Sequence, residues 1–130
     1  MLVVDASFVV DASMTVEGLD RLERWQAVAP ALLWSEATSV LHELRWRKAI
    51  STELADTAFR RLRQAPIGLR SPSRLSQEAW EIASRLGWAK TYDAEYVALA
   101  RLLGCALLTI DGKLARAAAG EARILGPTDL

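Results

Sequence analysis

The sequence of 130 residues is poor in cysteine, has no net charge and contains no long hydrophobic run. Its single cysteine, Cys105, cannot form a disulfide within the chain, so the fold is not a disulfide framework and we expect a reducing compartment. Sixteen basic and sixteen acidic residues cancel, which excludes a protein that coats nucleic acid through a strongly basic body. Any contact with nucleic acid must therefore be local.

The N-terminal segment lacks the basic residues and the long apolar stretch of a secretory signal, since Asp5 follows soon after Met1. No segment reaches the length of a membrane span either. We therefore expect a cytoplasmic protein that makes no membrane contact. An apolar fraction of 52% and a charged fraction of 25% are ordinary for a globular protein, and the length predicts a single domain over residues 1–130.

The chain alternates short apolar runs with longer helical patterns. Strands are expected at residues 2–4, 105–110 and 123–125, with a further short strand at 67–70. This alternation predicts the α/β class, with a central parallel sheet flanked by helices. The helical patterns cover residues 7–14, 18–28, 34–49, 52–64, 72–86, 92–103 and 112–119.

Some helix ends have a local chemical cause. Ser51 is expected to cap the helix that follows it, and Ser71 with Pro72 to begin the next. Gly104 is expected to end the helix over residues 92–103, because glycine adopts the left-handed conformation found there.

Four acidic residues stand where an apolar strand ends or a helix begins. Asp5 follows residues 2–4 and Asp111 follows residues 105–110, so both lie at the carboxyl edge of the sheet, where α/β proteins bind ligands. Glu36 and Asp93 fall in the first turns of predicted helices, where the helix dipole favours a carboxylate. Clustered carboxylates repel one another unless a cation holds them, so the pattern predicts a divalent-metal site.

Oxygen ligands without His or Cys favour Mg²⁺ or Mn²⁺ over zinc. Such an ion binds phosphate oxygens and water, which indicates phosphoryl transfer or phosphodiester hydrolysis with water as nucleophile. Ser7 and Thr109 are candidates to orient that water, a carboxylate or a phosphate, with helix capping and strand-end hydrogen bonding as open alternatives. His42 and Asp11 are each six residues, about 240° of helix, from Glu36 and Asp5, so both are expected to point away from the site.

Four motifs taken together carry a family resemblance. They are Leu2-Val3-Val4-Asp5-Ala6-Ser7, Pro30-x-Leu32-x-x-x-Glu36, Tyr92-Asp93-Ala94-x-Tyr96-x-Ala98-Leu99-Ala100 and Leu107-Leu108-Thr109-x-Asp111-x-x-Leu114. In this order, over nearly the whole chain, they resemble the PIN-domain family and within it most of all the VapC ribonuclease toxins.

The resemblance implies a three-layer α/β/α PIN fold and a metal-dependent endoribonuclease. Asp5, Glu36, Asp93 and Asp111 would be the catalytic acids that bind Mg²⁺ or Mn²⁺, and the substrate would be a single-stranded region or loop of RNA, such as transfer or ribosomal RNA. Family members commonly form homodimers and are inhibited by a cognate VapB-type antitoxin. Two departures stand out. Ser39 replaces an Asn of many relatives. Lys113 and Leu114 stand where some relatives carry a further acid, and the lack of this acid favours one metal over two.

Basic residues give candidates for RNA contact. Lys90, Lys113 and Arg116 flank the acidic segments and are predicted to contact phosphates on either side of the cleaved bond. Other basic residues crowd the ends of two helices, where they satisfy the helix dipole: Arg45, Arg47, Lys48, Arg60, Arg61 and Arg63.

Two other functions are compatible with parts of the pattern. A haloacid-dehalogenase-like phosphatase would use Asp5 as nucleophile, but it needs a second acid at the position of Ser7. A PIN-like module that binds RNA or protein without cutting would need no acids, whereas all four are present. A phospho-aspartate at Asp5 would favour the first function, and RNA binding indifferent to chelator would favour the second.

Overall fold

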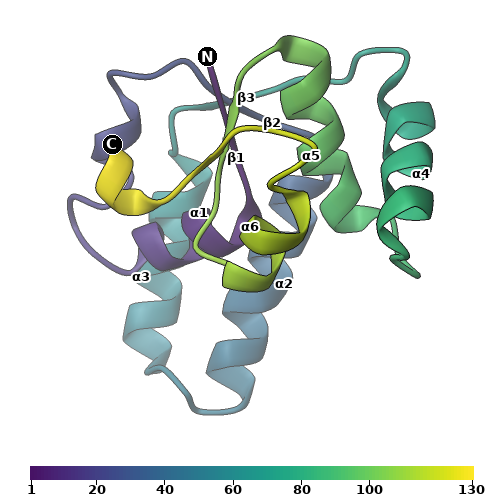
Figure 1. Cartoon of the computed structure of the whole chain (residues 1–130). Helices are drawn as coiled ribbons and strands as arrows, with labels where there is room; N and C mark the ends of the chain where they lie inside the picture. Colours follow the sequence, from purple (N-terminus) through teal and green to yellow (C-terminus); the bar gives the residue numbers. More distant parts are fainter.

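The computed structural model describes residues 1–130 and contains one five-stranded parallel sheet with the order β3-β2-β1-β4-β5 (Figure 1). The strands are β1 (Leu2–Val4), β2 (Ala27–Ala29), β3 (Ile67–Leu69), β4 (Ala106–Leu108) and β5 (Ile124–Leu125). The helices are α1 (Ala6–Ser13), α2 (Leu32–Trp46), α3 (Thr52–Arg63), α4 (Leu75–Leu86), α5 (Tyr92–Leu103) and α6 (Gly112–Ala118), with short 3₁₀ helices at Asp20–Leu22 and Pro127–Asp129. The predicted α/β class with a parallel sheet is confirmed.

The strand order creates a switch point between β1 and β4, at the centre of the sheet. From β1 the chain moves outward through β2 to β3, and it then returns to β4 and moves outward to β5 on the other side. Because β–α–β connections are right-handed, the helices of the first half and those of the second half cover opposite faces. Accordingly, α1, α2 and α3 pack against one another, while α5 packs on β1 and β4 with α4 beside it. A ligand site is expected at the switch point.

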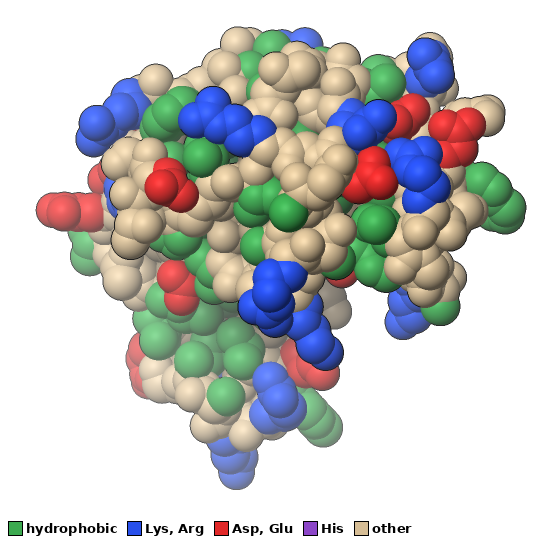
Figure 2. All heavy atoms as spheres, viewed as in Figure 1, with side chains coloured by type: hydrophobic (Ala, Val, Ile, Leu, Met, Phe, Trp, Pro, Cys, Tyr) green, Lys and Arg blue, Asp and Glu red, His purple; other side chains and the backbone are tan.

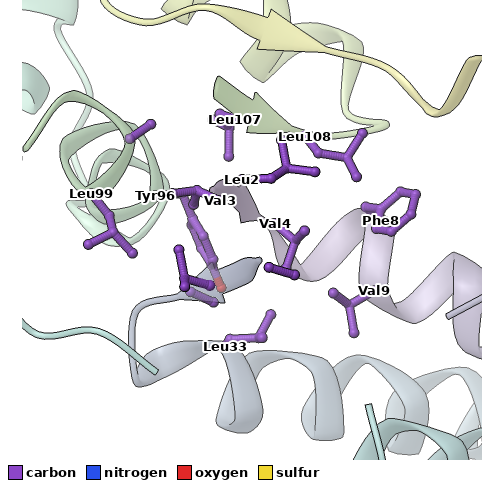
Figure 3. Close-up of a cluster of buried hydrophobic side chains, with 14 of the residues drawn as sticks. Leu2, Val3, Val4, Phe8, Val9, Leu33, Tyr96, Leu99, Leu107 and Leu108 are labelled. Atoms are coloured by element: carbon purple, nitrogen blue, oxygen red, sulfur yellow. The ribbon is translucent and has the colours of Figure 1, made fainter. Parts of the chain in front are cut away.

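The core lies on both faces of the central strands. All three residues of β1 and of β4 are buried, which explains why these strands are continuous apolar runs without alternation. Figure 3 shows side chains from β1, β4, α1, α2 and α5 meeting in one cluster. Tyr96 extends from α5 into this cluster, with its hydroxyl toward the helix that carries Leu33 (Figure 3).

The prediction of a helix over residues 18–28 is wrong. This segment contains the 3₁₀ helix Asp20–Leu22 and then the strand β2. Leu19 and Leu22 are both buried and stand three residues apart, a spacing that imitates a helical face. The strand itself is Ala-Val-Ala, short, fully buried and two-thirds alanine, so neither alternation nor β-propensity marks it.

Other boundaries differ by a few residues. The strand predicted at residues 105–110 is limited to β4, and the helix predicted from residue 34 begins at Leu32. Ser71 does not begin a helix: α4 starts at Leu75 after a turn closed by the Leu75 amide on the Pro72 carbonyl, 3.0 Å apart. The Ser51 hydroxyl does cap α3, accepting from the Leu54 amide at 3.1 Å, and Gly104 ends α5 with φ 64°.

Charged side chains are spread over the surface. In the view of Figure 2, Lys and Arg alternate with Asp and Glu, and several basic side chains gather toward the tip of the projecting α2–α3 pair. That tip is the end of α2 and the loop after it, where Arg45 forms an exposed ion pair with Asp56 at 3.4 Å. Exposed pairs of this kind contribute about 0–1 kcal/mol to the free energy of unfolding, so they add little to the stability of the fold. None of the helices is both long enough and apolar enough to span a bilayer.

Candidate active site

Asp5, Glu36, Asp93 and Asp111 all line one cavity of about 390 Å³, which we name the acid cavity. Asp5 follows β1 and Asp111 follows β4, so these two flank the switch point of the sheet. Glu36 comes from the second turn of α2, and Asp93 is the second residue of α5. The fold thus brings the four predicted acids to one place from four different elements.

Asp5 is the most buried of the four, with 4% of its surface exposed, and both of its carboxylate oxygens accept hydrogen bonds. Oδ1 accepts from the Phe8 amide at 3.0 Å and from the Ser7 hydroxyl at 2.8 Å, while Oδ2 accepts from the Thr109 hydroxyl. Thr109 also accepts from the Asp111 amide at 3.0 Å, and thereby joins the end of β1 to the start of α6. Ser7 and Thr109 therefore orient the Asp5 carboxylate, one of the roles predicted for them.

Asp111 and Asp93 are both exposed, but they differ in their hydrogen bonds. Asp111 caps α6, because its Oδ1 accepts from the Lys113 amide at 2.9 Å and the Leu114 amide at 3.2 Å. Its Oδ2 makes no hydrogen bond within the protein. Asp93 lies in the first turn of α5, where the positive end of the helix dipole favours a carboxylate, and its side chain accepts no hydrogen bond within the protein. Asp93 is thus the acid most available to a ligand.

Glu36 is held by Tyr96, a contact that the sequence analysis missed. The Tyr96 hydroxyl donates to Glu36 Oε1 at 2.5 Å and so connects α5 with α2. Tyr96 is 1% exposed, and a buried hydroxyl is expected to have a hydrogen-bond partner such as this one. The available signal was spacing: Tyr96 is three residues after Asp93, which places both on one face of α5.

The environment raises the pKa of three of the acids, Asp5, Glu36 and Asp93. Burial raises the pKa of Asp5, hydrogen bonds from Thr109, Phe8 and Ser7 oppose that rise, and the charge of Asp93 adds to it. Burial also raises the pKa of Glu36, against the hydrogen bond from Tyr96. Although Asp93 reaches the surface, partial desolvation of its carboxylate, followed by the charge of Asp111, raises its pKa. A bound cation would reverse these shifts, since it stabilises the ionised form of each carboxylate.

The donor set suits a hard cation that keeps part of its water. No three His, Cys, Asp or Glu side chains lie close enough together to form a metal-binding group as they stand. Mg²⁺ is usually held by only one or two carboxylates, with water filling its other positions, so it does not need such a group. The oxygens of Asp93 and Asp111 that make no hydrogen bond within the protein would be free to hold such an ion, with Asp5 and Glu36 beside them in the same cavity.

The other residues singled out in the sequence fall in different places. Asp11, expected to point away, lines the acid cavity, as do Met14 and Leu44. The expectation was wrong because it counted about 100° of helical rotation per residue from Asp5. Asp5 is the N-cap of α1 and has an extended backbone, so the helical rotation begins only at Ala6. His42 lies outside the acid cavity, as expected. Both His42 and Ser39 line a separate open groove on α2.

The predicted RNA-contacting cations also separate. Lys113 and Arg116 are exposed on α6, and neither lines the acid cavity. The guanidinium of Arg116 lies against Gly112, where a Cβ would be only 3.0 Å from Nη1. Lys90 lines a neighbouring pocket that shares Glu36 and Asp93 with the acid cavity. Of the three, Lys90 is the one placed beside the acids within a concave surface.

Comparison with known sequences assigns the family. The sequence model of the PIN domain matches residues 2–120. The chain belongs to the PIN domain family. This PIN domain is 37% identical to ribonuclease VapC3 of Mycobacterium tuberculosis over 121 residues, covering 89% of this chain and 86% of VapC3. The resemblance carried by the four motifs is therefore confirmed, and so is the assignment to VapC-type endoribonucleases at the level of the family.

Solved structures share the fold of this PIN domain at low sequence identity. The crystal structure of PAE2754 from Pyrobaculum aerophilum matches with a TM-score of 0.71 at 18% identity, over 98% of this chain and 90% of that one. VapC20 of Mycobacterium tuberculosis, described as a Sarcin-Ricin loop cleaving toxin, matches with a TM-score of 0.58 at 20% identity, over 90% of this chain and 95% of that one. The predicted three-layer PIN fold is confirmed.

Proposed function

We propose that this PIN domain, extending over residues 1–130, is an Mg²⁺- or Mn²⁺-dependent endoribonuclease of the VapC toxin type. Its substrate is a single-stranded region or loop of an RNA such as transfer or ribosomal RNA. The observation that carries the proposal is the convergence of four carboxylates on one cavity at the switch point of the sheet. The similarity to VapC3 supports the choice of RNA.

In this proposal the acids divide the work. Asp93, Asp111 and Asp5 hold the cation directly or through water. The hydrogen bonds from Thr109, Phe8 and Ser7 favour the ionised form of Asp5 against the effect of its burial, and a nearby cation would favour it further. When bound, the cation supplies Lewis-acid stabilisation of charge on the phosphate and lowers the pKa of water. Glu36 orients the attacking water and accepts its proton, a task suited to a carboxylate whose pKa is raised by burial.

Partners of the proposed toxin follow from the family. We propose inhibition by a cognate VapB-type antitoxin, whose most effective contact would place a cation among the four acids and so displace the metal. We also propose a homodimer in the cytoplasm. The open groove on α2, which includes Trp34 and the largely exposed Trp46, offers apolar surface for a protein contact.

The phosphatase alternative finds no support in the site. Both oxygens of Asp5 accept hydrogen bonds within the protein and its side chain is almost fully buried, which is a poor setting for a nucleophile that must reach a phosphorus atom. The non-catalytic alternative is decided by experiment.

Purified protein should cut total cellular RNA into discrete fragments when Mg²⁺ or Mn²⁺ is present, and EDTA should abolish the cutting. Restoring the ion after EDTA should restore the fragments, because the acids need a cation to act together. Gel analysis with sequencing of the new ends identifies the target. RNA that is bound equally with and without EDTA, and cut in neither case, would establish the non-catalytic module instead.

Replacing Tyr96 by Phe should lower cleavage at neutral pH by about tenfold, the effect expected from disturbing a residue that positions a catalytic group. The hydroxyl donates to ionised Glu36 and so lowers its pKa; without it the pKa of Glu36 rises further. The acidic limb of the rate–pH profile should therefore move to higher pH. A profile that keeps its midpoint would show that Tyr96 supports packing alone.

A further inference from the structure

A second pocket adjoins the acid cavity and is not used by the mechanism above. It has a volume of about 400 Å³, and we name it the Tyr92 pocket. Two of its lining residues, Glu36 and Asp93, also line the acid cavity, so the two spaces meet across these side chains. The rest of its lining comes from the turn between α4 and α5, and includes Gly87, Trp88, Lys90 and Tyr92.

The turn that forms this pocket is short and well anchored. Gly87 ends α4 in the left-handed conformation, with φ 69°, which glycine adopts without strain. The Trp88 amide then donates to the Ala83 carbonyl at 2.9 Å, and part of the Trp88 side chain packs on the core. The α4–α5 pair on either side is closely packed. The pocket wall is therefore fixed before any ligand arrives.

Two groups in this pocket have no partner within the protein. The side chain of Tyr92 is 56% exposed, and its hydroxyl makes no hydrogen bond to the protein. Lys90 is exposed and forms no ion pair, although acids lie close by. A free aromatic ring two residues from a free ammonium group, beside a site that handles phosphodiesters, is the combination that binds a single-stranded nucleotide.

We propose that the Tyr92 pocket is a base-binding subsite for one unpaired nucleotide next to the cleaved phosphodiester bond. The base stacks on the ring of Tyr92, and Lys90 contacts the adjoining phosphate. The four acids repel phosphate groups, so a neutral base and a nearby cation are what let an RNA strand approach them. The inference rests on the proposed ribonuclease function and names where the substrate is held.

Stacking on an aromatic ring accepts any base, so the subsite should require an unpaired base without selecting strongly among the four. This accounts for a preference for loops over duplex: a paired base remains stacked in its helix and cannot enter a pocket. The subsite thereby contributes to the selection of single-stranded RNA, while the identity of the base is read elsewhere.

The test measures binding of labelled six-nucleotide single-stranded RNAs by fluorescence anisotropy, in EDTA so that the proposed cleavage is stopped. One RNA is intact, and the others each lack one base. For the wild type, loss of the base at one position should lower affinity by about tenfold. Tyr92→Ala should bind the intact RNA about tenfold more weakly and should be indifferent to that missing base, so the two losses do not add.

Two variants control this experiment. Tyr92→Phe retains the ring and should bind like the wild type. Trp80→Ala removes an aromatic side chain that is 70% exposed and lies on α4 outside both cavities. It should leave unchanged both the affinity for intact RNA and the loss of affinity caused by the missing base. Because Tyr92 and Trp80 are surface residues, all variants should melt within about 3 °C of the wild type.

The outcomes separate the subsite from the proposed activity. If Tyr92→Ala binds every RNA as the wild type does, the subsite is overturned even where metal-dependent cleavage is found, and the pocket is left to a protein partner. A second outcome is that the wild type cuts no RNA with any metal but binds the RNA with the missing base more weakly, whereas Tyr92→Ala does not distinguish the two RNAs. In that case the subsite stands and the ribonuclease function fails.

Discussion

Replacing Asp93 by Asn is expected to lower RNA cleavage by about 100-fold or more, because a cation that loses one carboxylate loses several kcal/mol of its ability to stabilise charge. The fold should survive intact. Asp93 is exposed and accepts no hydrogen bond within the protein, so the amide replaces it without leaving a buried donor unpaired. The measurement is the initial rate of cleavage of one defined RNA at saturating Mg²⁺, with circular dichroism as the check on folding.

Asp11 supplies the matched control for this experiment. It is also an exposed acid that lines the acid cavity, but it lies near the C-terminal end of α1 and makes no hydrogen bond to the four predicted acids. Asp11→Asn removes the same charge by the same chemistry and should change the rate by less than about threefold, as expected of a surface charge that acts only through screened solvent. Equal losses in the two variants would show that the general charge of the cavity, and not a specific ligand, governs the rate.

Replacing Thr109 by Val should lower both stability and activity. The hydroxyl donates to Asp5 Oδ2 inside a buried environment, so its loss leaves a carboxylate oxygen desolvated and unpaired. Hydrogen bonds to charged groups contribute about 1.5–3 kcal/mol, so the melting temperature should fall by roughly 5–10 °C. Metal affinity should fall by about 10- to 100-fold, the usual effect of losing a group that orients a ligand.

The pH dependence of this loss identifies its cause. The Thr109 hydroxyl favours ionised Asp5, so removing it raises the pKa of Asp5 further above its ordinary value. The stability deficit of Thr109→Val should therefore be complete at neutral pH and should shrink as the pH falls through the pKa of Asp5. Ser7→Ala is the comparison, because Oδ1 keeps the Phe8 amide as donor and the deficit should be smaller. If both variants unfold like the wild type at neutral pH, the hydrogen-bond network does not hold Asp5.

The sequence predicts the convergence of the four acids because their positions follow from strand ends and helix starts. Asp5 and Asp111 end neighbouring parallel strands, and parallel strands share one carboxyl edge whatever the details of packing. The strands that mark this edge are strongly apolar, so their places in the chain are easy to identify. Strand β2, by contrast, is three residues long and mostly alanine, and only its neighbours in the sheet make it a strand.

Contacts between side chains of elements far apart in the sequence cannot be predicted from strand ends and helix starts. The Tyr96–Glu36 hydrogen bond joins residues 60 positions apart on two helices, and no local pattern specifies how these helices cross. The same holds for the Tyr92 pocket, where Lys90 and Tyr92 meet Glu36 only in the folded chain. Lys113 and Arg116 were equally plausible as RNA contacts by sequence distance, but α6 places both outside the acid cavity.

Binding of Mn²⁺, measured by electron paramagnetic resonance, shows whether the acid cavity holds the catalytic cation. Wild type and Asp11→Asn should each bind about one Mn²⁺ per chain, with Mg²⁺ as a competitor, and Asp93→Asn should bind at least tenfold more weakly, as expected when a direct carboxylate ligand is lost. Equal Mn²⁺ affinity in wild type and Asp93→Asn would show that the ion lies elsewhere and that the acid cavity is not the metal site.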